Sequence, residues 1–546
     1  MYKNFVSKSK MTEGLHTVDG VPVGIGDRLE CDGCLATIRF IGEVPPTKGV
    51  WLGVEWDDPE RGKHNGTHEG HTFFTTRHPK SGSFIRPKKA NFGVSFMSAV
   101  CDRYGRIEDE NAGVITDDLY VVGGKNQQTV VEMVGARKVN DLQGKLDELK
   151  EVALRGMLVY GTLASDDISV LVPSIVDLDI SQSLLSSWQH ISEITKQLRK
   201  LKSLNVSGNV LEIPDRPGDL LENFSRITAV FLNRMGYDWS EVLKCSEMFP
   251  RLEQLHVCFN GISTLSVLNG HLQNVQLVNL ESNNLQDWEQ LLYLGHLPHL
   301  HTLIVSDNKI PRVFFDSNGS FSTELFPKLR CLTINNNLVN EWESINELNK
   351  LASLEDLRIK SNPLMESATE QTVRQLLIAK LKHLKMCNRT EVANDERKGA
   401  EIDYLKRFGP EWVKSGGHQD LNVSKPSQEF VKQHPRYADL VSIWGAPEDS
   451  EMKQQSETLK SSLIGVKIIC PDLADSKVLE KKLPLTMTVG KLKALIFRVF
   501  KIDSDIKLFY KSLKNADQNL EYELDNDQSF LSFFAIEQGD TIIVKL

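Results

Sequence analysis

The chain has 546 residues, of which 40% are hydrophobic and 25% are charged, and its formal net charge at pH 7 is -9. These values are typical of a globular protein with several domains. The acidic balance argues against a broad attraction to nucleic acid or to an anionic membrane surface. No apolar run reaches the roughly 20 residues that a membrane-spanning helix needs.

The N-terminal sequence MYKNFVSKSKMTEG lacks the apolar stretch of a signal peptide, so we expect a cytoplasmic protein. Residues 1–24 are expected to form a disordered extension. Eight cysteines are scattered along the chain, which is typical of reduced thiols. Cys31 and Cys34 form a C-x-x-C, but no second pair follows at zinc-site spacing. We interpret this motif as a turn between two strands.

Residues 25–98 show short alternating segments broken by turns, a pattern that predicts a small all-β barrel. Between Arg61 and Lys89 there are seven Lys or Arg residues and one acid, a local charge of +6. Aromatic residues accompany these charges at Trp51, Phe73, Phe74 and Phe84. The combination favours an acidic ligand with an aromatic or apolar end. Single-stranded nucleic acid is the competing interpretation, which the acidity of the whole chain disfavours.

The segments WLGVEWDDPERGKHNGTHEGHTFF and GSFIRP resemble a CAP-Gly domain, whose hallmark is Gly-Lys-Asn-Asp-Gly. The resemblance implies a groove that holds the acidic, aromatic-ended C-terminal tail of α-tubulin or of microtubule end-binding proteins. Backbone N–H groups in a glycine loop suit a terminal carboxylate. By position, the peptide-binding residues would be Trp51, Gly62, Lys63, His64, Asn65, Gly66, Phe84 and Arg86.

Three positions depart from the family pattern. His64 replaces the hallmark asparagine, Asn65 replaces the aspartate, and Pro46 stands where the family often has an aromatic residue. If His64 faces the bound carboxylate, we expect tail affinity to rise as pH falls toward the histidine pKa. The four histidines His64, His68, His71 and His78 lack the spacing of a metal site, and we expect no bound metal.

Residues 149–365 repeat the pattern L-x-x-L-x-L-x-x-N-x-L at steps of 23 to 29 residues, which predicts a leucine-rich-repeat solenoid of α/β type. We call the position of the repeated asparagine the asparagine column. In two degenerate copies of the repeat, this position is occupied by Ser183 and Met235. The remaining column positions are Asn209, Asn260, Asn283, Asn308, Asn337 and Asn362.

Residues between the repeated leucines are expected to face the concave side, where a solenoid binds partners. Their mixed charge suits a protein surface better than a polyanion. The candidates are Asp177, Asp179, Phe231, Asn233, His256, Glu281, Ile304, Arg358 and Lys360.

Helical periodicity at 366–415 predicts a cap for the repeat array, and we interpret 99–148 and 416–462 as linkers. Residues 463–546 read as strand, strand, helix and further strands, with FFAIEQGDTIIVKL as the segment most similar to ubiquitin. The resemblance implies an α+β ubiquitin-like domain. The sequence ends at Leu546 without Gly-Gly, so we expect a docking module rather than a conjugated modifier.

The order of CAP-Gly, leucine-rich-repeat and ubiquitin-like modules resembles the tubulin-folding cofactor E family. That resemblance implies a cytoplasmic, cytoskeleton-associated chaperone that binds α-tubulin and works with cofactors B, C and D in assembling and disassembling the αβ heterodimer. The proteasome is a further partner to consider, through the ubiquitin-like domain. No nucleotide-binding or catalytic motif is found, so we expect neither a cofactor nor enzymatic activity. The alternatives are a microtubule plus-end adaptor and a proteasome-linked adaptor.

Overall fold

A computed structural model describes residues 16–18, 21–105, 120–123, 127–130, 145–315, 323–420, 422–448, 463–472, 478–484, 487–500, 506–511, 521–524, 526–527, 529, 531–534, 536 and 539–545. The chain divides into two compact units. The first comprises Met1–Tyr404 and Ser427–Leu440, and the second comprises Leu405–Pro426 and Val441–Leu546. Among the described helices, none is both long and apolar enough to cross a membrane.

The first module is built on an antiparallel sheet in the order β3-β4-β5-β8. Its strands are β3 (Arg28–Cys31), β4 (Cys34–Val44), β5 (Thr47–Trp56) and β8 (Gly82–Ile85). Asp32 and Gly33 join β3 to β4 with φ of 52° and 77°. Two positive φ angles are what a type I′ hairpin turn requires, so the predicted turn at the C-x-x-C motif is confirmed.

The segment expected to be a disordered extension contains two short strands. β1 (His16–Val18) and β2 (Val21–Val23) pair antiparallel. Residues 1–15 and 19–20 lie outside the described part of the chain.

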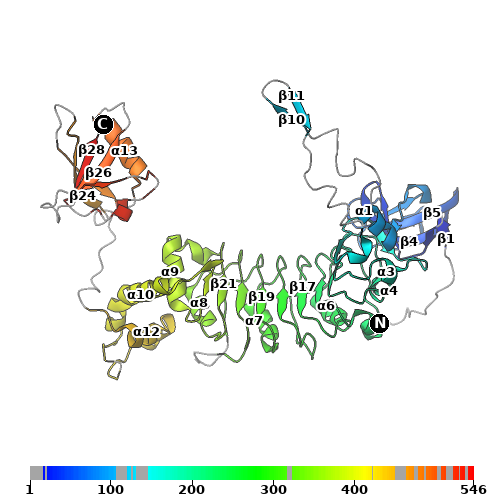
Figure 1. Cartoon of the computed structure of the whole chain (residues 1–546). Helices are drawn as coiled ribbons and strands as arrows, with labels where there is room; N and C mark the ends of the chain where they lie inside the picture. The colour runs from blue at the N-terminus through cyan, green and yellow to red at the C-terminus, as the bar shows by residue number, and fades with distance from the viewer. Residues whose placement is uncertain are drawn as a thin grey trace. The chain divides into compact units, whose positions relative to one another are not determined.

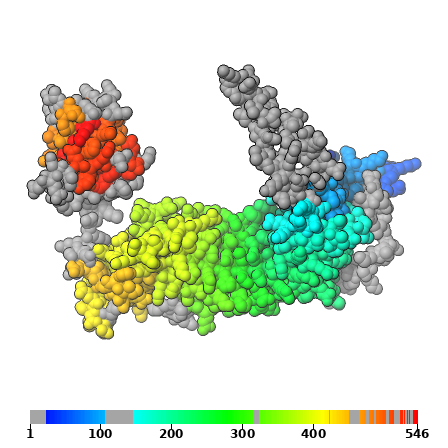
Figure 2. All heavy atoms as spheres, viewed as in Figure 1, coloured from blue at the N-terminus to red at the C-terminus, as the bar shows by residue number. Residues whose placement is uncertain are grey.

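The connection from the first module to the repeats differs from the expected linker. β9 (Val94–Ser95) pairs parallel with β13 (Val159–Gly161), and α1 (Phe96–Tyr104) follows directly. Phe96 and Val100 are fully buried in the hydrophobic core of the repeats. The Tyr104 hydroxyl accepts a 2.8 Å hydrogen bond from the Ala153 N–H. Helix α1 therefore covers the N-terminal end of the array, and Figure 2 shows the two modules as adjoining surfaces.

Within the residues expected to form that linker, β10 (Tyr120–Gly123) and β11 (Gln127–Val130) pair antiparallel, and η2 (Leu146–Glu148) precedes the first repeat strand. Residues 106–119, 124–126 and 131–144 lie outside the described residues.

The predicted solenoid is confirmed: short strands stack side by side along the array (Figure 1). Among the described residues the sheet has eleven strands, parallel except for its last pair. They are β12 (Glu151–Ala153), β14 (Asp177–Asp179), β15 (Ser203–Asn205), β16 (Ala229–Phe231), β17 (Gln254–His256), β18 (Leu277–Asn279), β19 (Thr302–Ile304), β20 (Cys331–Thr333), β21 (Asp356–Arg358), β22 (Met386–Cys387) and β23 (Thr390–Glu391).

The asparagine column forms the predicted ladder of buried hydrogen bonds. In a representative step, Asn308 Oδ1 accepts from the Leu285 N–H at 2.9 Å, while its Nδ2 donates to the Leu280 carbonyl at 3.1 Å. The residue before each of the eight predicted column positions has positive φ. These residues are Gln182, Gly208, Arg234, Phe259, Ser282, Asp307, Asn336 and Ser361.

Alternate repeats carry a helix that begins with tryptophan. These helices are α4 (Trp188–Thr195), α6 (Trp239–Ser246), α7 (Trp288–Leu291) and α8 (Trp342–Leu348). Two of the intervening repeats supply an aromatic partner: Phe224 lies 5.8 Å from Trp188 and Phe315 lies 5.9 Å from Trp288, measured between ring centroids. The sequence analysis did not detect this two-repeat alternation. The other short helices of the array are α3 (Ile168–Leu171), η3 (Pro217–Leu220), α5 (Leu221–Phe224) and η4 (Leu292–His296).

After the last repeat come η5 (Pro363–Glu366), α9 (Glu370–Lys380) and α10 (Asn394–Lys414), in the region expected to cap the array. The segment expected to be the second linker contains α11 (Gln428–Gln433) and α12 (Tyr437–Trp444). Arg436 is buried and forms a 3.0 Å ion pair with Glu401. Lys380 is also buried, and its Nζ donates to the Gln433 carbonyl at 2.9 Å. Residues 427–440 therefore pack against the cap.

The C-terminal module is a mixed sheet in the order β25-β24-β28-β26-β27 with one long helix, the predicted α+β arrangement. Its elements are β24 (Leu463–Ile469), β25 (Leu479–Pro484), α13 (Val489–Phe500), β26 (Lys507–Lys511), β27 (Tyr522–Glu523), η7 (Leu531–Phe534) and β28 (Thr541–Lys545). β24 and β28 pair in parallel at the centre of the sheet. Leu492 and Ile496 of α13 pack with Ile468 and Val544 in its core.

Candidate functional site

The loop Gly62–Gly66 lies directly against two neighbouring segments of the first module. The N–H groups of Lys63 and His64 both donate to the Gly82 carbonyl, at 2.8 and 3.2 Å. A Cβ on Gly62 would lie 2.3 Å from the Lys80 carbonyl oxygen, and one on Gly66 would lie 2.0 Å from that of Phe74. Gly66 also has φ of 97°. The glycines are therefore required for close backbone packing as well as for the turn.

His64 replaces the hallmark asparagine without losing the local turn. Its Nδ1 accepts a 3.0 Å hydrogen bond from the Gly66 N–H, two residues later. An asparagine side-chain oxygen makes the same two-residue contact in an Asx turn. Burial, followed by the charges of His68 and Lys63, lowers the pKa of His64 below 6.5. The neutral ring therefore uses Nδ1 to shape the loop and carries its proton on Nε2, which is its remaining donor.

Phe84 is at the centre of an aromatic cluster beside this loop. Its ring centroid lies 5.1 Å from that of His64, 5.5 Å from Phe73 and Phe74, and 6.3 Å from Phe40. The sequence analysis placed Phe73 and Phe74 near the basic face but omitted Phe40 from the site.

Phe40 reaches the cluster because β4 is irregular between Ile38 and Phe40. Such a bulge changes which residues share a face of the sheet. A Cβ on the facing residue, Gly53, would lie 2.4 Å from the Phe74 ring and 2.9 Å from the Phe40 Cβ. That glycine makes room for both rings, and the segment ATIRFIG carries no signal from which the bulge could be predicted.

Trp51, Phe84 and Arg86 lie on one face of the β5–β8 pair. Leu52 faces Ile85 and Gly53 faces Phe84 across these antiparallel strands, so alternation puts Trp51 beside Arg86. The Arg86 guanidinium carbon lies 3.8 Å from the centre of the Trp51 ring, and Arg86 donates to the Val50 carbonyl at 3.2 Å. The cation is thus held in place before any ligand binds.

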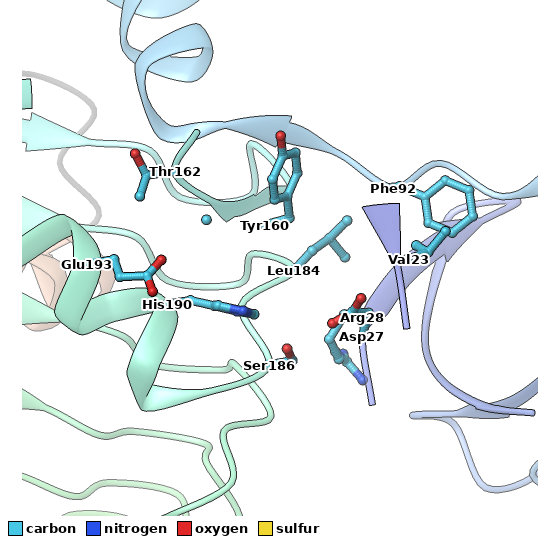
Figure 3. Close-up of a pocket in the computed structure, with 11 residues that line it drawn as sticks. Val23, Asp27, Arg28, Phe92, Tyr160, Thr162, Leu184, Ser186, His190 and Glu193 are labelled. Atoms are coloured by element: carbon cyan, nitrogen blue, oxygen red, sulfur yellow. The ribbon is translucent and has the colours of Figure 1, made fainter. Parts of the chain in front are cut away.

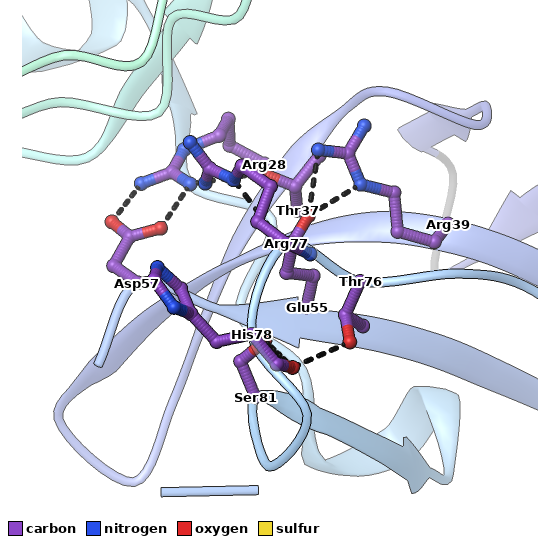
Figure 4. A network of polar contacts seen from close by, with 9 residues as sticks. All are labelled: Arg28, Thr37, Arg39, Glu55, Asp57, Thr76, Arg77, His78 and Ser81. Atoms are coloured by element: carbon purple, nitrogen blue, oxygen red, sulfur yellow. Dashed lines mark hydrogen bonds and ion pairs between the residues drawn. The ribbon is translucent and has the colours of Figure 1, made fainter. Parts of the chain in front are cut away.

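Some residues of the predicted basic face form ion pairs within the first module and are not available to a ligand. Glu55 is 2% exposed and receives bonds from the Arg77 N–H at 2.7 Å, from Arg77 Nε at 3.1 Å and from Arg39 (Figure 4). Burial alone would raise the pKa of Glu55, but these bonds hold it below 4.5. Lys80 pairs with Glu60 at 3.2 Å. Arg77 and Lys80 therefore anchor the segment before β8.

Other basic residues remain available to a ligand. Lys63, Lys88 and Lys89 are exposed, and none of them forms an ion pair with a residue that the structure describes. Asn65, the remaining predicted residue of the loop, is also exposed. His68 and His71 pair across β6 (Thr67–His68) and β7 (His71–Thr72). The described part of the chain holds no group of three His, Cys, Asp or Glu side chains arranged to bind a metal.

The structure places the nine predicted concave-face residues on the strands and at their C-terminal ends. Asp177 is the first residue of its three-residue strand. The residues in the third position of their strands are Asp179, Phe231, His256, Ile304 and Arg358. Asn233, Glu281 and Lys360 follow two residues after their strands. The central strand residues, such as Leu204 and Leu303, are fully buried, so the flanking positions belong to the opposite face.

Two of these residues interact directly. The rings of Phe231 and His256 stack with centroids 4.1 Å apart and an interplanar angle of 11°. Burial lowers the pKa of His256 to about 4. At neutral pH the pair is therefore an uncharged aromatic surface in the middle of the array.

A cavity of about 180 Å³ lies between the first module and the first repeats (Figure 3). Arg28, Tyr160, His190 and Glu193 are among the residues that line it. Arg28 Nε and His190 Nδ1 are buried, and neither has a hydrogen-bond partner within the described part of the chain. None of its lining residues belongs to the predicted peptide groove.

Comparison with known domains agrees with these modules. A CAP-Gly domain model matches residues 25–90, a leucine-rich repeat model matches 241–415, and a ubiquitin-like domain model matches 463–545. Over 521 residues the chain is 44% identical to tubulin-specific chaperone E from Xenopus laevis, covering 95% of this chain and 98% of the relative. The chain belongs to the tubulin-specific chaperone E family.

Other members of the family agree over the same length. The protein from Homo sapiens is 42% identical over 530 residues, covering 95% of this chain and 98% of its own. The plant relative, tubulin-folding cofactor E from Arabidopsis thaliana, is 29% identical over 523 residues, covering 93% of this chain and 95% of its own. Among solved structures, the C-terminal ubiquitin-like domain of mouse tubulin-specific chaperone E is 37% identical, covering 16% of this chain and 92% of that domain, with a TM-score of 0.15.

Proposed function

We propose that the protein is a tubulin-folding cofactor that binds α-tubulin and takes part in assembly and disassembly of the αβ heterodimer. The observation that carries this proposal is 44% identity over 95% of the chain to a tubulin-specific chaperone E. On this proposal the protein works by binding in the cytoplasm, in association with the cytoskeleton, and has no catalytic step.

The first module would bind the acidic tail of α-tubulin. The support is the aromatic cluster around Phe84, the fixed Arg86–Trp51 pair and the exposed Lys63 in the Gly62–Gly66 loop. An aromatic end of the tail would pack against the rings, while its carboxylates would meet the cations and the loop.

The repeats would bind the folded body of tubulin. A strand ladder of this length offers a broad surface, whereas the groove accommodates only a short peptide. Cofactors B, C and D and, through the ubiquitin-like domain, the proteasome remain the partners to test by pull-down with the full chain.

The deciding experiment mixes the purified chain with tubulin on a sizing column and titrates it with an α-tubulin tail peptide by calorimetry. We expect co-elution and a complex with the peptide. Failure to bind either would overturn the proposal. Cosedimentation with microtubules and no complex with unpolymerised tubulin would favour the plus-end adaptor instead.

A further inference from the structure

The strand register places four residues side by side in the middle of the array. Phe231, His256, Asn279 and Ile304 are the third residues of β16, β17, β18 and β19 and pair in that order across the parallel sheet. All four are half-buried, and Phe231 stacks on His256. We call these four residues the mid-array row.

The row is mainly apolar at neutral pH. His256 Nδ1 lies 3.5 Å from Asn279 Nδ2, and His256 Nε2 is buried with no hydrogen-bond partner among the residues that the structure describes. Because the ring is uncharged, the Phe231–His256 pair and Ile304 present apolar surface on either side of a single amide, Asn279. Large aromatic and aliphatic anchors at the centre of a protein surface are where binding energy is concentrated.

Two carboxyl groups lie at the C-terminal end of the same strands. Glu281 follows β18, Asp307 follows β19, and their carboxyl groups are near enough to interact. Burial first, and then the charge of Asp307 and the hydrogen bond that a protonated Glu281 would donate to it, raises the pKa of Glu281 above 4.5. Asn336 Nδ2 donates to Asp307 Oδ1 at 2.7 Å.

Neither carboxyl group forms an ion pair with a Lys or Arg of the described residues. Two neighbouring carboxylates without a cation repel each other, and a cation brought within about 4–6 Å would relieve that repulsion. The apolar row and the acidic pair therefore complement a surface that carries an apolar side chain next to a Lys or Arg.

We propose that the mid-array row, with Glu281 and Asp307, binds a segment of the folded body of tubulin that presents an apolar side chain beside a lysine or arginine. This inference rests on the proposed function. On this proposal, charge directs two parts of tubulin to two different modules. The acidic tail suits the groove beside Lys63 and is repelled by Glu281 and Asp307. Charge complementarity thus sets which part of the partner meets which module.

The test uses the full chain and αβ-tubulin whose acidic tails have been removed by limited proteolysis, so that the groove does not contribute. Phe231→Ala should weaken binding at least about tenfold, the size of a hot-spot loss. The double variant Glu281→Gln, Asp307→Asn should weaken it several-fold and reduce its salt dependence, because the attraction to a cation is lost. Two exposed glutamates, Glu247 directly after α6 and Glu289 in α7, provide the matched control: Glu247→Gln with Glu289→Gln should bind like the wild type.

The double variant keeps the shape of both side chains, so it tests the charge even if Phe231→Ala folds poorly. Equal affinity and equal salt dependence for the wild type and the double variant would overturn the cation contact. Unchanged binding by a folded Phe231→Ala would overturn the apolar contact. In both cases tail-less tubulin still binds the wild type, so the proposed function stands. If tail-less tubulin does not bind the wild type at all, body binding by the repeats fails together with this inference.

Discussion

Replacing Gly66 with alanine should disable the peptide groove, and Gly70→Ala should not. Both glycines have positive φ, 97° at Gly66 and 79° at Gly70, so both substitutions incur the left-handed backbone cost of about 1–2 kcal/mol. Only Gly66 is also enclosed. Its added Cβ would lie 2.0 Å from the Phe74 carbonyl oxygen, whereas at Gly70 nothing lies within 4 Å.

A 2.0 Å contact is far inside the ordinary van der Waals range of 3.4–4 Å, so the loop or the Phe74 backbone must move. Overpacking of this kind adds about 1–3 kcal/mol, which brings the total for Gly66→Ala to about 2–5 kcal/mol. Because the loop and Phe74 both border the groove, the movement should reduce affinity for the tail peptide at least about tenfold.

Calorimetric titration with an α-tubulin tail peptide measures this effect, and thermal unfolding of the same samples measures stability. The expected result is a large loss for Gly66→Ala with affinity close to wild type for Gly70→Ala. Equal affinity in both variants would refute the argument that the packing of this loop shapes the peptide site.

Four further predictions concern charge and the junction with the repeats. Lys63→Ala should weaken tail binding more at low salt than at 0.15 M, because at 0.15 M exposed charges are screened over about 8 Å. Calorimetry at the two salt concentrations tests this prediction, and an equal loss of affinity at both would contradict it. Arg86→Lys should also weaken binding, since lysine loses the planar stack on Trp51, and unchanged affinity would rule that stack out. Glu55→Gln should lower the unfolding free energy by about 1–3 kcal/mol at neutral pH. The folded pKa of Glu55 is below 4.5, so its stabilisation is present above that pH and is lost as pH falls through the folded value; denaturant unfolding curves of variant and wild type should converge in acid. Deleting residues 1–98 should destabilise the repeats, since it removes the buried Phe96, whereas a truncation ending before β9 should not; equal melting temperatures would contradict this.

The repeats could be predicted almost residue by residue because their information is local. Each copy carries its own leucines and its own asparagine, and the left-handed residue precedes every predicted column position, including Ser183 and Met235. The I′ turn at Asp32 and Gly33 is equally local. Periodic sequence fixes such elements without reference to distant parts of the chain.

What the sequence analysis missed depends on contacts between distant residues. The segment 99–104 looks like the start of a linker, yet it is helical because Phe96 and Val100 find a core in the repeats. Arg77 looks available to a ligand until its pairing with Glu55, 22 residues away, is known. In both cases the decisive partner lies outside the local pattern.

The candidate groove contains residues placed by the local sequence pattern and residues placed by contacts that the pattern does not reveal. The positions of Trp51, Phe84 and Arg86 on one face follow from the strand pattern, but Phe40 joins them only through a bulge. For His64, the sequence suggested a charge that would strengthen tail binding in acid. In the structure Nδ1 accepts from the Gly66 N–H, so the neutral ring carries its proton on Nε2. Forming the cation would protonate Nδ1 and break this bond, so the predicted rise of tail affinity in acid stays a prediction that opposes the turn.

The alternation of tryptophan-led helices has a consequence for how this array can change in length. Trp188 packs against Phe224 of the next repeat, and Trp288 packs against Phe315 in the same way. Inserting or deleting one repeat would bring two tryptophan-led helices, or two repeats without one, into contact and would leave a large ring without its matching space. At these two places the unit that can be duplicated or lost without repacking is therefore a pair of repeats.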